Sequence, residues 1–235
     1  LRDLNLIFWG LKIFQISSKN ATKKIEQFLT PNEKKKLKSS LEFLLTIRCH
    51  LHYFSKRSND KLSFDFQRLI SDKINKKKMK GTLNSKVELM MKNYFFQTKN
   101  TKNLVQVLSQ ILDERLKKKT FISDVKKNDE NLLEKFLANL ARDKKEFFQH
   151  RVVLDRINKI PKKHFFSKKN ISNFKKIFFS EKKEKFMLLY DLGVLSKIIP
   201  DFSSIEYLTQ FDRYHSLTVG QHTLRALNIL KDIRK

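Results

Sequence analysis

A histidine near the carboxyl end of the sequence stands where a loop turns into a helix. Thr218 and Gln221 have the spacing of a capping box, in which each side chain accepts a hydrogen bond from the backbone N–H of the other residue. The box predicts a defined helix start, so the imidazole of His222 should project from the first turn at a set angle, as a metal ligand must. Two alternatives are open: His222 is a half-buried packing residue, or His215 is the ligand. Because His215 precedes the capped turn, we expect it to contact substrate or to support the site.

An arginine interrupts an otherwise apolar helical stripe. Arg48 lies on the stripe that begins after Pro31, and a half-buried guanidinium needs a carboxylate or phosphate partner. An ion pair between helices and a contact with a nucleotide are both open for it. His50 and His52 are two residues apart, so on a helix they point in nearly opposite directions and cannot share a metal ion.

Three stretches resemble, in the same order, the bifunctional PII-protein uridylyltransferase/uridylyl-removing enzymes. Residues 1–4 (LRDL) resemble the end of that family's nucleotidyltransferase domain, and residues 43–67 (FLLTIRCHLHYFSKRSNDKLSFDFQ) are similar to its helical signature. Residues 210–230 (QFDRYHSLTVGQHTLRALNIL) resemble the start of its HD-type hydrolase domain. This chain has Gly220-Gln221 where the family usually has Asp-Glu, and Leu217 where an aromatic residue is usual.

The resemblance implies two opposed reactions. One transfers UMP from UTP to a tyrosine of the PII signalling protein with Mg²⁺, and the other removes that UMP hydrolytically with a divalent metal ion in the HD half. It implies that His222 is a ligand of the second metal and that Asp3 is a catalytic, metal-binding carboxylate of the transferase site. The alternative for Asp3 is a charge that favours a helix N-terminus. We assign Arg48 to nucleotide binding, and glutamine would act as an effector through domains absent from this chain.

The composition predicts an all-α fold. The 235 residues include only 4 Gly and 3 Pro, too few for the turns of a many-stranded protein. We expect three segments: 1–118, the helical end of the transferase region; 119–200, a helical connector; and 201–235, the start of the HD domain. We expect the boundary at the KKKT run of residues 117–120. Because the chain begins with Leu and shows no leader, we expect an internal fragment that catalyses neither reaction by itself.

Capping motifs and apolar periodicity place the helices. Thr30 to Glu33 form a capping box, and Ser85 to Glu88 predict a second helix that runs to about residue 116, with a possible break at 98–103. The apolar residues of segment 3–16 predict burial on most sides. Shorter helices are expected at 131–140, 150–157, 171–179 and 183–192, with Gly193 ending the last of them.

The net charge of +27 raises a second class of function, a non-enzymatic helical adaptor that binds polyanions or a partner helix. Of 51 basic residues only 11 are Arg, and Lys lacks the planar fork that favours specific phosphate recognition. We therefore expect nucleic-acid binding to be incidental. The single cysteine, Cys49, cannot form an internal disulfide, so a cytoplasmic protein with a buried Cys49 is expected.

Overall fold

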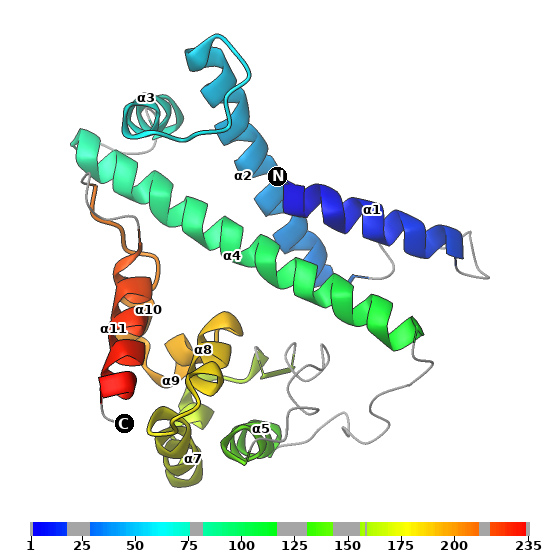
Figure 1. Cartoon of the computed structure of the whole chain (residues 1–235), viewed down its shortest axis with the longest axis vertical. Helices are drawn as coiled ribbons and strands as arrows, with labels where there is room; N and C mark the ends of the chain where they lie inside the picture. Colours follow the sequence, from blue (N-terminus) through cyan, green and yellow to red (C-terminus); the bar gives the residue numbers. More distant parts are fainter. Residues whose placement is uncertain are drawn as a thin grey trace. The chain divides into compact units, whose positions relative to one another are not determined.

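The computed structural model describes residues 2–17, 29–75, 82–116, 131–142, 156–157, 159–211 and 217–233. Within these ranges every regular element is helical, which confirms the predicted all-α class for that part of the chain (Figure 1). None of the described helices has both the length and the apolar character that a bilayer span requires. The elements are α1 (Arg2–Ser17), α2 (Pro31–Ser55), α3 (Phe64–Asn75), α4 (Leu83–Leu116), α5 (Leu132–Ala141), the 3-10 helix η3 (Lys162–Phe166), α7 (Lys168–Phe178), α8 (Lys183–Asp191), α9 (Leu195–Ile198), α10 (Pro200–Ile205) and α11 (Val219–Ile233).

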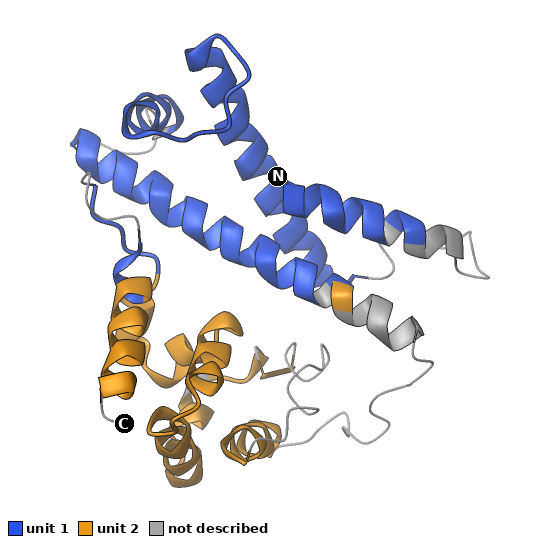
Figure 2. Ribbon diagram, in the orientation of Figure 1, with its two compact units in different colours: residues 1–108, 207–220 blue, residues 109–206, 221–235 orange. Residues whose placement is uncertain are grey.

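The chain divides into two compact units, coloured separately in Figure 2. Unit 1 comprises residues 1–108 and 207–220, and unit 2 comprises residues 109–206 and 221–235. The segment 207–220 therefore belongs to unit 1, although it is flanked on both sides by residues of unit 2. The three-segment organisation inferred from the sequence stays a prediction, and its proposed boundary at residues 117–120 lies outside the described residues.

The capping box at the start of α2 is present as predicted. The Thr30 N–H donates to Glu33 Oε2 at 2.7 Å, and the Glu33 N–H donates to Thr30 Oγ1 at 3.3 Å, with Pro31 at the first helical position. These contacts satisfy two backbone donors that a bare helix end leaves unpaired.

The start of α4 differs from the prediction. The helix begins at Leu83, and the Ser85 N–H donates to Thr82 Oγ1 at 3.3 Å, so Thr82 rather than Ser85 holds the first turn. Both residues suit a cap, and the earlier one adds a full turn to the helix. The helix then continues to Leu116 without the expected break at 98–103.

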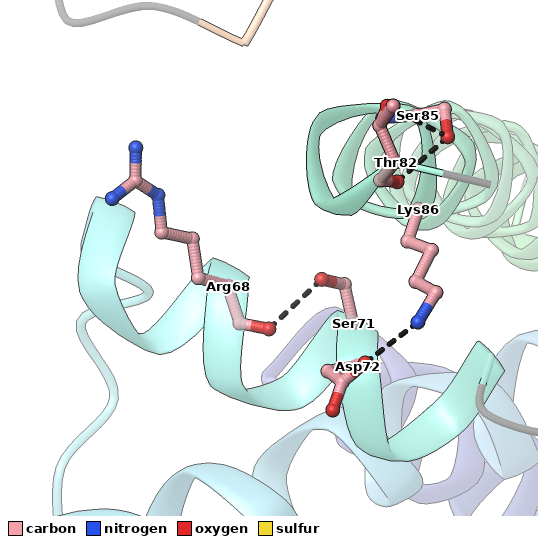
Figure 3. A network of polar contacts seen from close by, with 6 residues as sticks. All are labelled: Arg68, Ser71, Asp72, Thr82, Ser85 and Lys86. Atoms are coloured by element: carbon pink, nitrogen blue, oxygen red, sulfur yellow. Dashed lines mark hydrogen bonds and ion pairs between the residues drawn. The ribbon is translucent and has the colours of Figure 1, made fainter.

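Helices α2, α3 and α4 share the core of unit 1. One cluster of buried side chains between them consists of Ile47, Leu51, Ile70 and Met90. Polar contacts join the same helices: Ser40 Oγ of α2 donates to Gln97 Oε1 of α4 at 2.9 Å, and Lys86 Nζ of α4 donates to Asp72 Oδ1 of α3 at 2.7 Å (Figure 3).

Helix α1 is less buried than its sequence predicts. Leu4 and Ile7 are fully buried, and a Cβ placed on Gly10 would lie 2.5 Å from Leu108 Cδ2, so this face packs closely on α4. The other face is open in the structure, with Trp9 70% and Ile13 61% exposed. The expectation of burial on most sides was therefore wrong, because one face of a single helix is enough to contact α4.

Unit 2 has its own core, built from α5, η3 and α7 to α11. Its fully buried side chains include Phe136, Phe165, Phe186 and Leu189. The predicted helices at 131–140, 171–179 and 183–192 correspond to α5, α7 and α8 within a few residues. Gly193 has φ +71°, and the Val194 N–H reaches the Leu189 carbonyl at 2.9 Å, which confirms the predicted left-handed end of α8. The helix expected at 150–157 falls almost entirely outside the described residues.

Several lysines of unit 2 stabilise the fold instead of facing solvent. Lys185 is 9% exposed and its Nζ donates to the Ala141 carbonyl at 2.9 Å, at the C-terminal end of α5. Lys231 Nζ donates to the Ser180 carbonyl at 3.1 Å and lies 5.5 Å from the Phe186 ring centroid. Ammonium groups at helix ends pair with carbonyls that lack helical partners, and rings attract cations. Part of the positive charge is therefore structural.

Residues 207–211 lie across α3 and α4 of unit 1. The Tyr207 ring packs on Phe96 at 5.5 Å, and the Phe211 ring packs on Phe64 at 5.4 Å. Thr209 Oγ1 donates to the carbonyl of Glu88 at 3.5 Å. We call residues 207–211 the strap. The Val219 N–H donates to the carbonyl of Leu208 at 2.8 Å, so the strap also holds the beginning of α11.

Candidate functional site

The candidate site is centred on the first turn of α11, which begins at Val219 directly after the buried Thr218. The predicted helix start is therefore confirmed. Leu224 is 2% exposed and belongs to the core of unit 2, and Leu227 packs against that core. His222 is exposed, as the sequence requires of a side chain that binds something outside its own helix. Leu230 of the same helix is 60% exposed and lies on the outer face.

A buried polar cluster lies beside this turn. Tyr190 of α8 and Glu206, which follows α10, are only 7% and 5% exposed. Ser196 Oγ donates to Glu206 Oε2, and the Gln221 side chain hydrogen-bonds to the Tyr190 hydroxyl. Burial, then the negative charges of Glu206 and Asp191, raise the pKa of Tyr190 to about 12, and the Gln221 hydrogen bond opposes them. Tyr190 therefore stays protonated at neutral pH.

Nothing in the sequence pointed to this cluster. Tyr190, Glu206 and Gln221 belong to different elements, and each is unremarkable in its own segment. The capping role of Gln221 toward the backbone of Thr218 stays a prediction, and the hydrogen bond of its side chain to Tyr190 had no counterpart in the sequence. The buried carboxylate of Glu206 could have been suspected only from the apolar residues around it.

Arg48 has a protein partner in unit 1. Its Nε lies 3.3 Å from Asp60 Oδ1, and His52 Nε2 lies 3.7 Å from the same oxygen. Asp60 belongs to the loop after α2, so the pair joins a helix to a loop. The ion pair that the sequence had suggested would have joined two helices. The Arg48 side chain is 40% exposed and that of Asp60 73%, so solvent screens the pair. Asp60 lies within the 43–67 stretch, so a search of that stretch for a carboxylate partner of Arg48 could have found it.

Three further residues were singled out in the sequence, and the structure describes two of them. Asp3 lies exposed in the first turn of α1, where a carboxylate also favours the helix N-terminus. Cys49 is exposed on α2, which corrects the expectation of a buried thiol. Its position follows from the apolar stripe of α2, whose buried members Ile47 and Leu51 flank it. His215 lies outside the described residues.

A metal site needs several ligands in one place. Among the residues that the structure describes, no group of three or more His, Cys, Asp or Glu side chains is placed to hold a metal ion. His222 and Asp3 can each supply one ligand, and a single ligand does not hold a divalent ion against water. The described residues therefore provide parts of the predicted sites and not complete ones.

Comparison with known proteins finds a family similarity in the first part of the chain. Residues 1–109 match the family model of GlnD PII-uridylyltransferase. This match confirms the resemblance read from residues 1–4 and 43–67, and it covers α1 to α3 and most of α4.

The similarity extends beyond residue 109. The bifunctional uridylyltransferase/uridylyl-removing enzyme of Novosphingobium aromaticivorans is 28% identical over 267 aligned residues, which cover 100% of this chain and 29% of that enzyme. The chain thus spans less than a third of the length of this curated relative. No solved structure matches the chain.

Proposed function

We propose that this chain is an internal segment of a bifunctional enzyme that attaches UMP to the PII signalling protein and removes it again. The observation that carries the proposal is the similarity over the whole chain to a relative with both activities in its name, together with the family match of residues 1–109. Under this proposal UTP and PII are the substrates, and the cytoplasm is where they meet.

In this proposal residues 1–109 contribute to the transferring half. Asp3, exposed at the start of α1, is one carboxylate of a Mg²⁺ site whose other ligands lie outside the described residues. Arg48 is screened and half-exposed in its pair with Asp60, so a nucleotide phosphate could replace Asp60 as its partner.

The residues around α11 contribute to the removing half. His222 offers an imidazole on a rigid helix anchored by Leu224, which is the placement a metal ligand requires. A bound divalent ion would supply an activated water for hydrolysis of the uridylyl group. The role of this chain is to hold His222 in place for such an ion.

The test is His222→Ala in the full-length enzyme, scored for both reactions. Loss of a metal ligand should lower uridylyl removal by at least about a hundredfold, while transfer of UMP is largely kept, because the two sites are separate. The thermal midpoint should stay unchanged, since the side chain is exposed.

Two results would contradict this assignment. Full retention of uridylyl removal would show that His222 is not a ligand. Equal loss of both activities with a lower thermal midpoint would show a structural residue. Arg225→Ala is the matched control, because Arg225 is exposed on the same helix, one turn further on.

A further inference from the structure

The orientation of His222 depends on what grips the inner face of α11. Gln221 and Leu224 are three residues apart, so they lie on one face of the helix, and His222 points about 100° away from Gln221. Leu224 is buried at 2% exposure, whereas His222 is exposed. Contacts made by the inner face therefore decide where the imidazole points.

Apolar contacts alone do not set a rotation precisely enough. Burial of Leu224 and Leu227 fixes how close α11 lies to the core, but apolar attraction has no preferred direction. A hydrogen bond weakens steeply when its angle changes, so it adds the missing directional constraint. The first turn of α11 has such a bond, between Gln221 and the hydroxyl of Tyr190.

Tyr190 is itself held from several sides. Its ring packs edge-on against Phe202 at 6.1 Å, in the core of unit 2. The negative charge of Glu206 acts on its hydroxyl, and Ser196 donates a hydrogen bond to that carboxylate. A buried polar group that loses its partner costs more than the bond contributed, so the cluster favours one arrangement.

Two residues of the polar cluster also flank one segment of the chain. Glu206 directly precedes residues 207–220, and Gln221 directly follows them. The strap and the Val219–Leu208 hydrogen bond hold the middle of this segment in unit 1. The polar cluster includes the residues at the two ends of this segment. The chain that enters α11 is therefore restrained both before the first turn and within it.

We propose that Tyr190 is a positioning residue for His222, acting through its hydrogen bond with Gln221 on the first turn of α11. This inference rests on the proposed function of His222. Removal of the Tyr190 hydroxyl should let the first turn rotate and fray, and the imidazole would then leave its productive place even though no residue near the substrate has changed.

The experiment is Tyr190→Phe in the full-length enzyme, because this change removes one oxygen and keeps the ring. We expect uridylyl removal to fall about tenfold, as for other residues that orient a ligand, with transfer of UMP unchanged. Backbone amides of residues 219–223 should exchange faster with deuterium, and amides of α2 should not. Tyr53→Phe is the matched control, because Tyr53 is 72% exposed on α2.

A double variant tests whether Tyr190 acts through Gln221. If it does, Tyr190→Phe with Gln221→Met should remove uridylyl groups no more slowly than the more impaired of the two single variants. Additive losses would overturn that route. Unchanged removal and unchanged exchange in Tyr190→Phe would overturn the proposal altogether, as would equal loss of both activities with a lower thermal midpoint.

The His222→Ala enzyme separates this inference from the proposed function. If His222→Ala abolishes removal and Tyr190→Phe leaves it intact, the positioning role is wrong and the metal assignment stands. If His222→Ala retains removal, the metal assignment is wrong. Faster exchange at residues 219–223 in Tyr190→Phe would then show that Tyr190 orders α11 without positioning a ligand. That result also overturns the proposal.

Discussion

At the scale of single residues, the chain places its ionisable groups in two kinds of surroundings. Arg48 and Asp60 meet at the surface, where water screens their charges, and such pairs contribute about 0–1 kcal/mol. Tyr190 and Glu206 are buried, so each depends on neighbours to replace the water it has lost. The surface pair can therefore exchange partners, whereas the buried cluster holds one geometry.

The raised pKa of Tyr190 predicts how stability should depend on alkaline pH. Tyrosine has a pKa of 10.0 in the unfolded chain and Tyr190 about 12 in the folded one, so between these values the folded state keeps a proton that the unfolded state has lost. The stabilisation is complete below pH 10 and is lost as the pH rises through about 12. Tyr190→Phe lacks this component.

Urea unfolding of the wild-type and Tyr190→Phe proteins at several pH values would check this. The stability advantage of the wild type should shrink between about pH 10 and pH 12, and the lysines titrate in both proteins and cancel in the difference. A constant difference over this range would show that Tyr190 has an ordinary pKa.

At the scale of helices, capping determines where α2 begins. The Thr30 side chain accepts a hydrogen bond from the Glu33 N–H, and the Glu33 carboxylate accepts one from the Thr30 N–H. We expect Thr30→Ala to lower the free energy of unfolding by about 1 kcal/mol, the usual contribution of such a cap.

Thr46 offers a matched control on the same helix. Its hydroxyl donates to the Glu42 carbonyl one turn earlier, and the side chain is exposed. Thr46→Ala should leave stability unchanged or raise it slightly, because alanine favours helix and that carbonyl already has a helical partner. Urea unfolding followed by circular dichroism would compare the two, and an equal loss in both would argue against a capping role for Thr30.

At the scale of the whole molecule, the positive charge has structural uses. Lys185 donates to the carbonyl of the last residue of α5, Lys231 donates to a carbonyl after α7, and Lys86 joins α4 to α3. A surface built to bind polyanions would leave such groups free to reach phosphates. These contacts therefore weaken the alternative of a basic adaptor, although other lysines remain solvent-exposed.

The remaining charge predicts weak binding to nucleic acid that depends strongly on salt. Affinity of the 235-residue chain for duplex DNA should fall about a thousandfold between 50 mM and 200 mM salt, as for contacts that only release counterions. Two duplexes of unrelated sequence should bind equally. Fluorescence anisotropy would measure both, and tight, sequence-selective binding at physiological salt would favour the adaptor.

Much of this protein could be read from local sequence. The all-α class follows from scarce Gly and Pro, the starts of α2 and α11 from residues within one turn of each other, and the left-handed end of α8 from Gly193. The family resemblance also came from three short strings in order, and the match of residues 1–109 confirms the first two of them. These features depend on neighbours within a few residues, so the sequence alone determines them.

Only the tertiary structure decided which distant residues meet. The partner of Arg48, the exposure of Cys49 and the open face of α1 depend on which side of each helix finds a neighbour. The hydrogen bond between Tyr190 and Gln221 joins residues 31 positions apart (221 minus 190), and the strap joins Phe211 to Phe64. A helical pattern shows which residues share a face, but packing of the whole chain selects what that face contacts.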